Sequence, residues 1–472
     1  MHPSAEDFSI DGLTSSASFQ GRSWNSAAFR RSVPVTPPAE EAADSYFQGT
    51  EELRLSAVTE DETPLVAVIG IGYVGLHLIT AFARHYAVIA FDISQTRLSS
   101  VADQLPKTAN LTLTSDASHL TGVTHFLVSV PTLLVPGTSV VDTSCLRIAL
   151  NTIFAHARVG STIIIESSVA VGMTRRLLAK MVQERQLKAG MSPEVRSQDL
   201  IRYRVLTPHQ RVDPGRVSPS FEAIPKIISG LDDLAPGSLS SIRKLYSPIF
   251  KTLVAVSSPE VAEITKLYEN CQRMICIAYA NEMADACRAF ATPIDPFEVS
   301  RAAATKPFGY LPFSPSAGVG GHCIPVNPHY LFSTSDFPLL RHATEKMRAR
   351  PMAIGDDTMR KLYSVGRHMK GKPRVLVVGV AFKPGQHVLS NSSGVQIINH
   401  LLDYWEADVS FADPLVKEES VPQAPKLDVE REWNQEGLSE FDAIIVVVKQ
   451  VGLKLDVLER LEGTFITWCC QR

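Results

Sequence analysis

The chain has 472 residues, which is too many for one hydrophobic core, so we expect two or three domains. Hydrophobic residues make up 45% of the chain and charged residues 20%, the balance of an ordinary globular protein. The formal net charge is −3 and no basic stripe dominates, so we expect no nucleic-acid partner.

Residues 1–62 are rich in Ser, Ala, Glu and Pro and show no sustained periodicity. This composition predicts a mostly disordered leader with a local helix around 39–55. The first residues carry acids and lack the apolar stretch of a secretory signal. No window of the chain reaches the roughly 18 apolar residues of a membrane span. We therefore expect a cytoplasmic protein without a membrane partner.

The next segment, 63–257, alternates between strand-like and helix-like patterns. Leu65–Ile69 has the composition of a buried strand and is followed by a glycine turn, a helical segment and a second strand, Val88–Phe91. Further apolar runs of strand length lie at 124–132 and 161–169, with helical stretches between them. This order predicts a Rossmann-like domain built from βαβ units around a mainly parallel sheet.

A glycine motif stands between the first strand and the first helix. Gly70, Gly72 and Gly75 form GxGxxG, in which the glycines allow a tight turn, a close approach to a pyrophosphate and close helix–strand packing. Asp92 ends the second strand, where it can accept hydrogen bonds from ribose hydroxyls and repels the 2′-phosphate of NADP. The alternative is a glycine turn that packs a helix on a strand and binds nothing. We predict an NAD site whose residues include Gly70, Gly72, Tyr73, Val74, Gly75, Asp92 and Arg97.

A long helical pattern then runs from Pro259 to about Ala291, inside a central helical segment that we assign to 258–350. Lys266 and Asn270 are four residues apart on this helix, so they project from one face. A cation and an amide donor together stabilise an oxyanion beside a reacting carbonyl. The alternative is an ordinary solvated face.

The last segment, 351–472, predicts a second and smaller α/β domain. A strand–turn–helix signal occupies 373–405, and strand-length apolar runs follow it at 407–414, 441–449 and 463–468. The expected fold class is therefore α/β, with two doubly wound Rossmann-like domains joined by a long central helix.

One cysteine lies in an unusual setting, "GVGGHCIPVNPHYL" at 318–331. The seven cysteines of the chain form no CxxC pair and no zinc-like spacing, so we expect no metal and a reducing compartment. The glycines near Cys323 permit close backbone approach to a ligand. If Cys323 reaches Lys266, the ammonium group favours its thiolate. By itself, Cys323 also fits an inert buried thiol.

The motifs "VAVIGIGYVG", "VSVPT", "ESSVAVGMT", "RVDPG", "EITKLYENCQRMICIAYANE" and "GVGGHCIPV" occur in this order. Over residues 65–470 the chain resembles the UDP-glucose/GDP-mannose dehydrogenase family, and "GHCIPV" resembles the branch that acts on UDP-N-acetylhexosamines. That family oxidises the C6 alcohol of a nucleotide sugar to a carboxylate in two NAD-dependent steps. The resemblance implies UDP-N-acetylhexosamine or UDP-glucose as substrate. It also implies a homodimer or higher homo-oligomer built on the central helix.

The resemblance gives the matching residues roles as well. Cys323 attacks the C6 aldehyde to form a thiohemiacetal and then a thioester, which water hydrolyses. Lys266 and Asn270 hold the oxyanion, and Thr132 positions substrate or water beside the cofactor. Glu166 lies near the nicotinamide. The nucleotide sugar contacts Lys266, Asn270, Gly318, Gly320, Gly321 and Lys383.

Three positions depart from the family pattern. Asn327 stands where the family commonly has an aspartate that assists proton transfer, and an amide cannot act as a base. Gln210 follows Thr207-Pro208-His209 where a Ser-Pro-Glu is usual, and Ser390-Asn391-Ser392-Ser393 stands where an arginine precedes Ser-Pro. Loss of one base slows a reaction by roughly 10²–10⁴-fold. Two alternatives therefore stay open: a weakly active or non-catalytic paralogue that binds NAD and a nucleotide sugar, and a two-electron β-hydroxyacid dehydrogenase.

Overall fold

The computed structural model describes residues 56–59, 61–105, 108–135, 138, 140–193, 221–292, 294–306, 308–364 and 371–471. These residues lie within one compact unit, Phe47–Arg472. The predicted helix at 39–55 lies outside them. The described chain packs before residue 63, because the Val58 N–H donates to the Val159 carbonyl at 2.9 Å.

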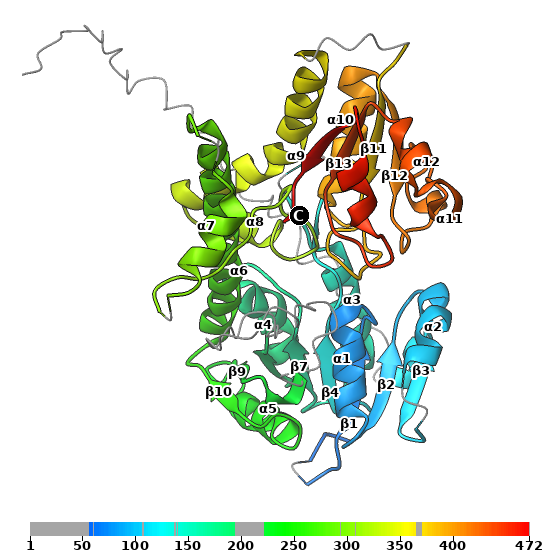
Figure 1. Ribbon diagram of the computed structural model, residues 1–472. Coiled ribbons are helices and arrows are strands. Elements are labelled where there is room, and N and C mark those ends of the chain that lie inside the picture. The colour runs from blue at the N-terminus through cyan, green and yellow to red at the C-terminus, as the bar shows by residue number, and fades with distance from the viewer. Residues whose placement is uncertain are drawn as a thin grey trace, which may run out of the picture. The chain divides into compact units, whose positions relative to one another are not determined.

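A large sheet forms the core of the first part of the chain (Figure 1). Its described strands pair in parallel apart from β8 and β9, which are antiparallel. The apolar runs named above do not include β3, β8, β9 and β10, and β3 and β10 form the two edges of the sheet. In spatial order the strands are β10 (Leu253–Ala255), β9 (Lys226–Gly230), β8 (Lys188–Met191), β7 (Thr162–Ile165), β4 (His125–Val128), β1 (Leu65–Ile69), β2 (Ala87–Phe91) and β3 (Leu111–Thr114).

Helices cover both faces of this sheet, because its central strands are apolar on both sides. Val66 and Val68 of β1 pack on one face, and Ala67 and Ile69 pack on the other. The first face is covered by α1 (Tyr73–Phe82), α2 (Gln95–Val101) and α5 (Ser238–Tyr246). The second is covered by α3 (Ser144–His156) and α4 (Met173–Arg185). A small antiparallel pair, β5 (Leu133–Leu134) and β6 (Val141–Asp142), follows β4.

The second sheet is parallel throughout its described strands and lies in the C-terminal part of the chain. Its strands are, in spatial order, β12 (Asp408–Ala412), β11 (Arg374–Val378), β13 (Ala443–Val446) and β14 (Phe465–Trp468). Helix α10 (Ser393–Trp405) packs on it, and the short helices α11 (Val429–Glu432) and α12 (Gln435–Ser439) follow β12. The predicted α/β class with two Rossmann-like sheets is confirmed.

Long helices connect the two sheets along the chain. The 31-residue helix α6 (Pro259–Ala289) begins where predicted, because Ser258 caps it by accepting from the Val261 N–H and a proline follows at the first helical position. It packs against α8 (Asn327–Phe332) and α9 (Pro338–Ser364), and α7 (Pro296–Ala303) follows it. Helix α9 continues through Pro351, so the boundary that we place at 350/351 falls inside a helix.

Candidate active site

The glycine motif forms the turn between β1 and α1. Gly70 has φ +91°, a backbone conformation that favours glycine. A Cβ on Gly75 would lie 2.1 Å from the Gly70 carbonyl oxygen, so α1 approaches β1 too closely for a side chain there. A Cβ on Gly72 would meet nothing within 4 Å. The fold explains the first and third glycines, whereas the second leaves open space of the kind that a pyrophosphate needs.

Asp92 connects the end of β2 to this glycine turn. One carboxylate oxygen accepts from the Ile71 N–H at 2.9 Å and the other from the Ser94 N–H at 2.9 Å. The Arg97 Nε donates to the Ile71 carbonyl at 2.8 Å. Asp92 is half-buried, and a carboxylate can accept more than one bond per oxygen, so it retains capacity for ribose hydroxyls. Tyr73 opens α1 and is exposed, and Val74 follows it half-buried. The chain's residues fit an NAD ribose and pyrophosphate here.

We expect Gly75→Ala and Gly72→Ala to separate folding from cofactor binding. Gly75→Ala forces a methyl group against a backbone oxygen and should lower the free energy of unfolding by roughly 1–3 kcal/mol, the usual cost of overpacking. Gly72→Ala should leave the fold intact and weaken NAD binding about tenfold or more, because the methyl group occupies the space of the pyrophosphate. Thermal denaturation without NAD and titration with NAD measure the two effects. An equal drop in Tm for both variants would contradict this assignment.

The loops after β1, β4 and β7 are joined at the carboxyl edge of the large sheet. The Ser129 hydroxyl donates to the Gly70 carbonyl at 2.8 Å, and the Thr132 hydroxyl donates to the Ser168 carbonyl at 3.0 Å. Open α/β sheets bind ligands at this edge. Thr132 therefore lies on the loop that borders the glycine turn.

Helix α6 presents Lys266 and Asn270 to the interior, where their exposed fractions are 3% and 2%. The solvated-face alternative is therefore wrong. One turn earlier, the Glu263 carboxylate accepts from the Gly172 N–H and from the Thr174 N–H at 2.8 Å, which fixes α6 to the start of α4. Burial raises the pKa of Glu263, and these hydrogen bonds oppose the rise.

The segment with Cys323 leads into α8, which packs on α6. The Asn327 N–H donates to the Cys323 carbonyl at 2.9 Å, so the chain makes a helical turn at the cysteine. The buried Asn327 side chain accepts a hydrogen bond from the Asn270 Nδ2. The structure thus joins the Asn270 and Asn327 side chains, and the backbone of Cys323 lies one helical turn before Asn327. Cys323 is half-buried, unlike the fully buried Cys271, whose pKa burial raises to about 12.

The glycines before Cys323 pack closely on a loop of the C-terminal sheet domain. A Cβ on Gly318 would lie 2.8 Å from the Ser393 hydroxyl oxygen, and one on Gly320 would lie 2.7 Å from the Phe382 Cβ. Gly321 has φ +87°, which favours glycine by itself. Close packing therefore explains why glycine stands at these positions. The predicted contacts of these glycines and of Lys383 with a nucleotide sugar remain predictions.

Ser390 and Asn391 hold the cysteine segment from the same loop. The Gly321 N–H donates to the Ser390 carbonyl at 2.8 Å, and the Asn391 Nδ2 donates to the Gly321 carbonyl at 2.9 Å. The His322 Nε2 and the Ser390 Oγ are 2.9 Å apart. Ser390, one of the residues in place of the family's Arg-x-Ser-Pro pattern, therefore contacts the neighbour of the proposed nucleophile.

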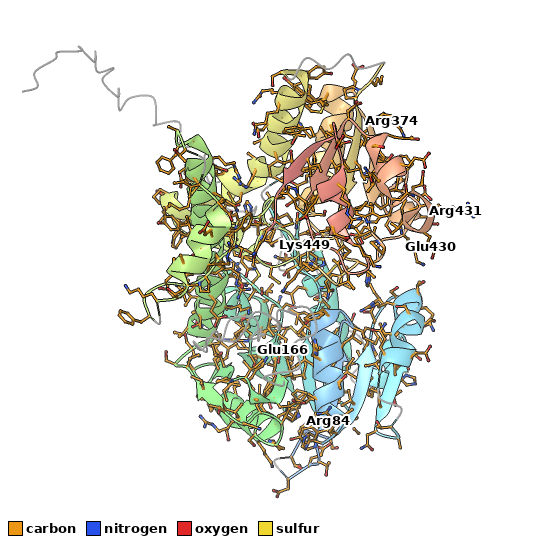
Figure 2. All side chains as sticks on the ribbon, viewed as in Figure 1. Arg84, Glu166, Arg374, Glu430, Arg431 and Lys449 are labelled. Carbon is orange, nitrogen blue, oxygen red and sulfur yellow. The ribbon has the colours of Figure 1, made fainter. Side chains whose placement is uncertain are left out.

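Glu166 follows β7 and is buried in the large sheet domain (Figure 2). Its carboxylate accepts from the Lys226 Nζ at 2.6 Å and from the Tyr246 hydroxyl. Burial is the largest cause of the raised pKa of Tyr246, so the phenol keeps its proton. The structure gives Glu166 a buried ion pair, and its position beside the nicotinamide stays a prediction.

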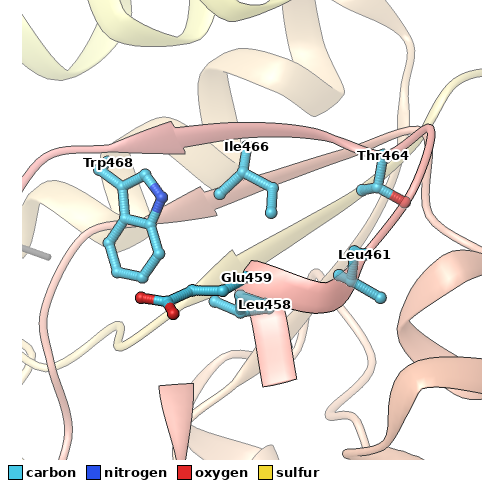
Figure 3. A pocket seen from close by; sticks show the side chains of 6 residues that line it. All are labelled: Leu458, Glu459, Leu461, Thr464, Ile466 and Trp468. Carbon is cyan, nitrogen blue, oxygen red and sulfur yellow. The ribbon is translucent and has the colours of Figure 1, made fainter. Parts of the chain in front are cut away.

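A pocket lies apart from the predicted site residues. A cavity of about 420 Å³ in the C-terminal domain is lined by Leu458, Glu459, Leu461, Thr464, Ile466 and Trp468 (Figure 3).

The segment Thr207–Gln210, which departs from the family pattern, lies outside the described residues. Within the described ranges, no cluster of three or more His, Cys, Asp or Glu side chains could hold a metal ion. No helix there is long and apolar enough to span a bilayer.

The predicted set of site residues does not include Ser129, Glu263 and Tyr330. Ser129 stands three residues before Thr132, and Glu263 precedes Lys266 by one helical turn, so spacing along the same elements points to both. Tyr330 lies three residues after Asn327, and this helical spacing places both residues on the same side of α8.

Comparison with known proteins decides the family. Three models of the UDP-glucose/GDP-mannose dehydrogenase family match the chain: its NAD binding domain over 65–250, its central domain over 260–345 and its UDP binding domain over 376–465. The chain belongs to the UDP-glucose/GDP-mannose dehydrogenase family. As a member, it is an NAD-dependent oxidoreductase that acts on a CH–OH group.

Relatives extend over most of the chain. UDP-N-acetyl-D-glucosamine 6-dehydrogenase of Pseudomonas aeruginosa is 29% identical over 75% of this chain and 83% of its own length. UDP-N-acetyl-D-mannosamine dehydrogenase of Methanococcus vannielii is 26% identical over 74% and 79%. The solved UDP-D-ManNAc dehydrogenase of Pyrococcus horikoshii has the same fold, with a TM-score of 0.72 and 22% identity, covering 86% of this chain and 95% of that structure.

Proposed function

We propose that this family member oxidises the C6 alcohol of a UDP-sugar to the uronate, through intermediates bound to Cys323. The observation that supports this proposal is the hydrogen bond between the Asn270 and Asn327 side chains of α6 and α8, one helical turn from Cys323. The names of the relatives favour a UDP-N-acetylhexosamine as substrate, and UDP-glucose is the other candidate.

The chain's own residues supply the covalent chemistry. NAD would supply the hydride acceptor, and a separate NAD molecule is needed for each of the two oxidation steps. After the alcohol becomes an aldehyde, the Cys323 thiolate forms a C–S bond to C6, and the carbonyl oxygen takes a proton to give a thiohemiacetal. Loss of hydride from C6 and a proton from oxygen gives the thioester. Water then attacks the thioester, and the acid and the thiol are released.

Lys266 and Asn270 suit the charge that develops on the C6 oxygen. Both side chains are buried, and a buried ammonium group or amide donor stabilises an oxyanion more strongly than an exposed one. Thr132 lies at the edge of the same sheet as the glycine turn, where it can hold the sugar or the hydrolytic water against the cofactor.

A weakly active paralogue is the second candidate, and Asn327 favours it. Asn327 is 1% exposed and makes its hydrogen bond to another amide, so no carboxylate stands at this position to accept a proton from water. Hydrolysis of the thioester is the step that suffers.

One assay separates these functions. The purified protein is incubated with NAD and a panel of UDP-sugars, and NADH formed per sugar consumed is counted. Two NADH with a uronate product support the proposal. One NADH with accumulating aldehyde shows that oxidation from the thiohemiacetal fails. NAD binding without any NADH leaves the non-catalytic paralogue.

We also propose that the chain assembles as a dimer through α6. One stripe of this helix is apolar and exposed, opposite the face that carries Lys266 and Asn270. Exposed apolar side chains that gather on one face mark a protein–protein contact surface, and this face belongs to a 31-residue helix. Its residues are Val261, Ile264, Tyr268, Tyr279 and Met283.

We expect Tyr268→Glu with Tyr279→Glu to convert the dimer to a monomer, because two charges per chain would be buried at a symmetric contact. Sedimentation velocity measures the change, and Tyr404→Glu, at an exposed tyrosine on α10, is the matched control. A wild-type protein that sediments as a monomer would refute the dimer.

A further inference from the structure

The hydroxyl of Tyr330 is a buried polar group in α8. Tyr330 is 1% exposed and packs in α8 among apolar residues of α6 and α9, including Leu267, Met274 and Met347. Among the described residues, its hydroxyl oxygen makes no hydrogen bond of normal geometry. A buried polar group left unpaired costs about 1–3 kcal/mol. Such a group in a folded protein calls for a specific explanation.

Helical spacing places Tyr330 on the face that carries the thiol. Cys323, Asn327 and Tyr330 stand at positions i, i+4 and i+7, which share one side of a helix. The bond from the Asn327 N–H to the Cys323 carbonyl shows that this helical path already includes the cysteine. Asn327 meets Asn270 of α6, so this side of α8 is turned toward the proposed oxyanion site.

The electrostatics around Tyr330 agree with this placement. Burial raises the pKa of Tyr330 well above its usual value, the Thr132 hydroxyl lowers it, and a charged Cys323 raises it further. The thiol and Thr132 are therefore both near the phenol. Because its pKa is raised, the phenol stays protonated at working pH and acts as a hydrogen-bond donor.

We propose that Tyr330 is a positioning residue, whose hydroxyl donates a hydrogen bond to the Cys323 sulphur when the thiol ionises and so stabilises the thiolate. This inference rests on the proposed role of Cys323 as the nucleophile. A hydrogen bond to the charged form of a group favours that form.

Other charged groups also face this region. On α6 they are Glu263, Lys266 and Glu269, and the Lys266 Nζ lies 3.6 Å from the Glu269 carboxylate. Along the cysteine segment and α8 they are His322 and His329, and the pKa of His329 is lowered, chiefly by burial. Lys383 stands on the loop that packs against this segment. None of them is altered when Tyr330 is changed to phenylalanine, so the comparison isolates the hydroxyl.

The test measures the thiol directly and needs no substrate. Wild-type protein and Tyr330→Phe are alkylated with iodoacetamide over a range of pH, and the modification of each cysteine is followed by peptide mass spectrometry. We expect the apparent pKa of Cys323 to rise by about one unit, so that its alkylation at neutral pH becomes about tenfold slower. The exposed Cys145 reports on the reagent in the same sample and should not change. A Cys323 profile that superimposes on the wild type would overturn the proposal.

Stability separates this role from a packing role. Phenylalanine keeps the ring and therefore the packing of α8, so the Tm of Tyr330→Phe should stay close to that of the natural sequence. A raised Tm with an unchanged Cys323 profile would assign Tyr330 to the core alone and overturn the proposal.

A second measurement covers the case in which the variant fails to fold. Incorporation of 3-fluorotyrosine in the natural sequence makes the phenol a stronger donor and should lower the apparent pKa of Cys323. A pKa that rises or stays constant would count against the hydrogen bond. Failure of the proposed function would look different: no NADH from any UDP-sugar, with the alkylation profiles still dependent on Tyr330.

Discussion

The Cys323→Ser variant is expected to form no acid from any UDP-sugar, although it still binds NAD. A serine hydroxyl is almost wholly protonated at neutral pH, so it adds poorly to the aldehyde, and no thioester forms to carry the acyl group to hydrolysis. The glycine turn and Asp92 lie on β1, β2 and α1, so the substitution leaves the cofactor site in place. Uronate formation, measured by mass spectrometry, and NAD titration report the two properties.

Two cysteines provide controls for this variant. Cys145→Ser removes an exposed thiol on α3 and should retain the wild-type rate. Cys271→Ser removes a buried thiol whose pKa is about 12, which excludes it as a thiolate at neutral pH. Undiminished uronate formation by Cys323→Ser would remove the thiol from the mechanism.

Asn327→Asp should have the opposite effect and accelerate uronate formation by roughly 10²–10⁴-fold, the usual contribution of a general base. The two side chains have nearly the same shape, and either can accept the hydrogen bond from the Asn270 Nδ2. Burial at 1% exposure should raise the pKa of the new carboxyl, so the gain in rate should appear as pH rises through that raised value.

The rate gain in Asn327→Asp must fall on the hydrolytic step. Rapid quenching, followed by mass spectrometry of the Cys323 peptide, should show acyl-enzyme in the natural sequence and much less in the variant. Asn151→Asp, at an exposed position on α3, is a control of equal charge. If Asn327→Asp is no faster than the natural sequence, water activation does not depend on position 327.

The sequence predicts most of the fold because its signals are local. The β1 run, the GxGxxG turn and the Ser258 cap each depend on neighbouring residues, and the structure has all three. Strands β3, β8, β9 and β10 are missed because segments of three to five residues carry too few positions to show a clear apolar pattern. The long α9 is missed because Pro351 interrupts its pattern, and its packing on α6 and α10 compensates for the missing N–H.

The site is predicted unevenly for the same physical reason. Spacing along α6 identifies Lys266 and Asn270, but their burial comes from α8 and α9, which are distant in sequence. Glu166 has the composition of a site residue, yet its partner Lys226 is 60 positions away. The glycines before Cys323 suggest a ligand until the structure shows Phe382 and Ser393 against them.

The contacts of Gly321 and His322 with Ser390 and Asn391 mean that the C-terminal domain cannot be removed without disturbing the segment that carries Cys323. The peptide that bears the nucleophile is held on one side by α6 and on the other by a loop belonging to the opposite end of the polypeptide. The position of Cys323 therefore depends on both the central helix and the C-terminal domain. An enzyme truncated before β11 would keep the glycine turn and Cys323. It would lose the contacts from Ser390 and Asn391 that hold the cysteine segment in position.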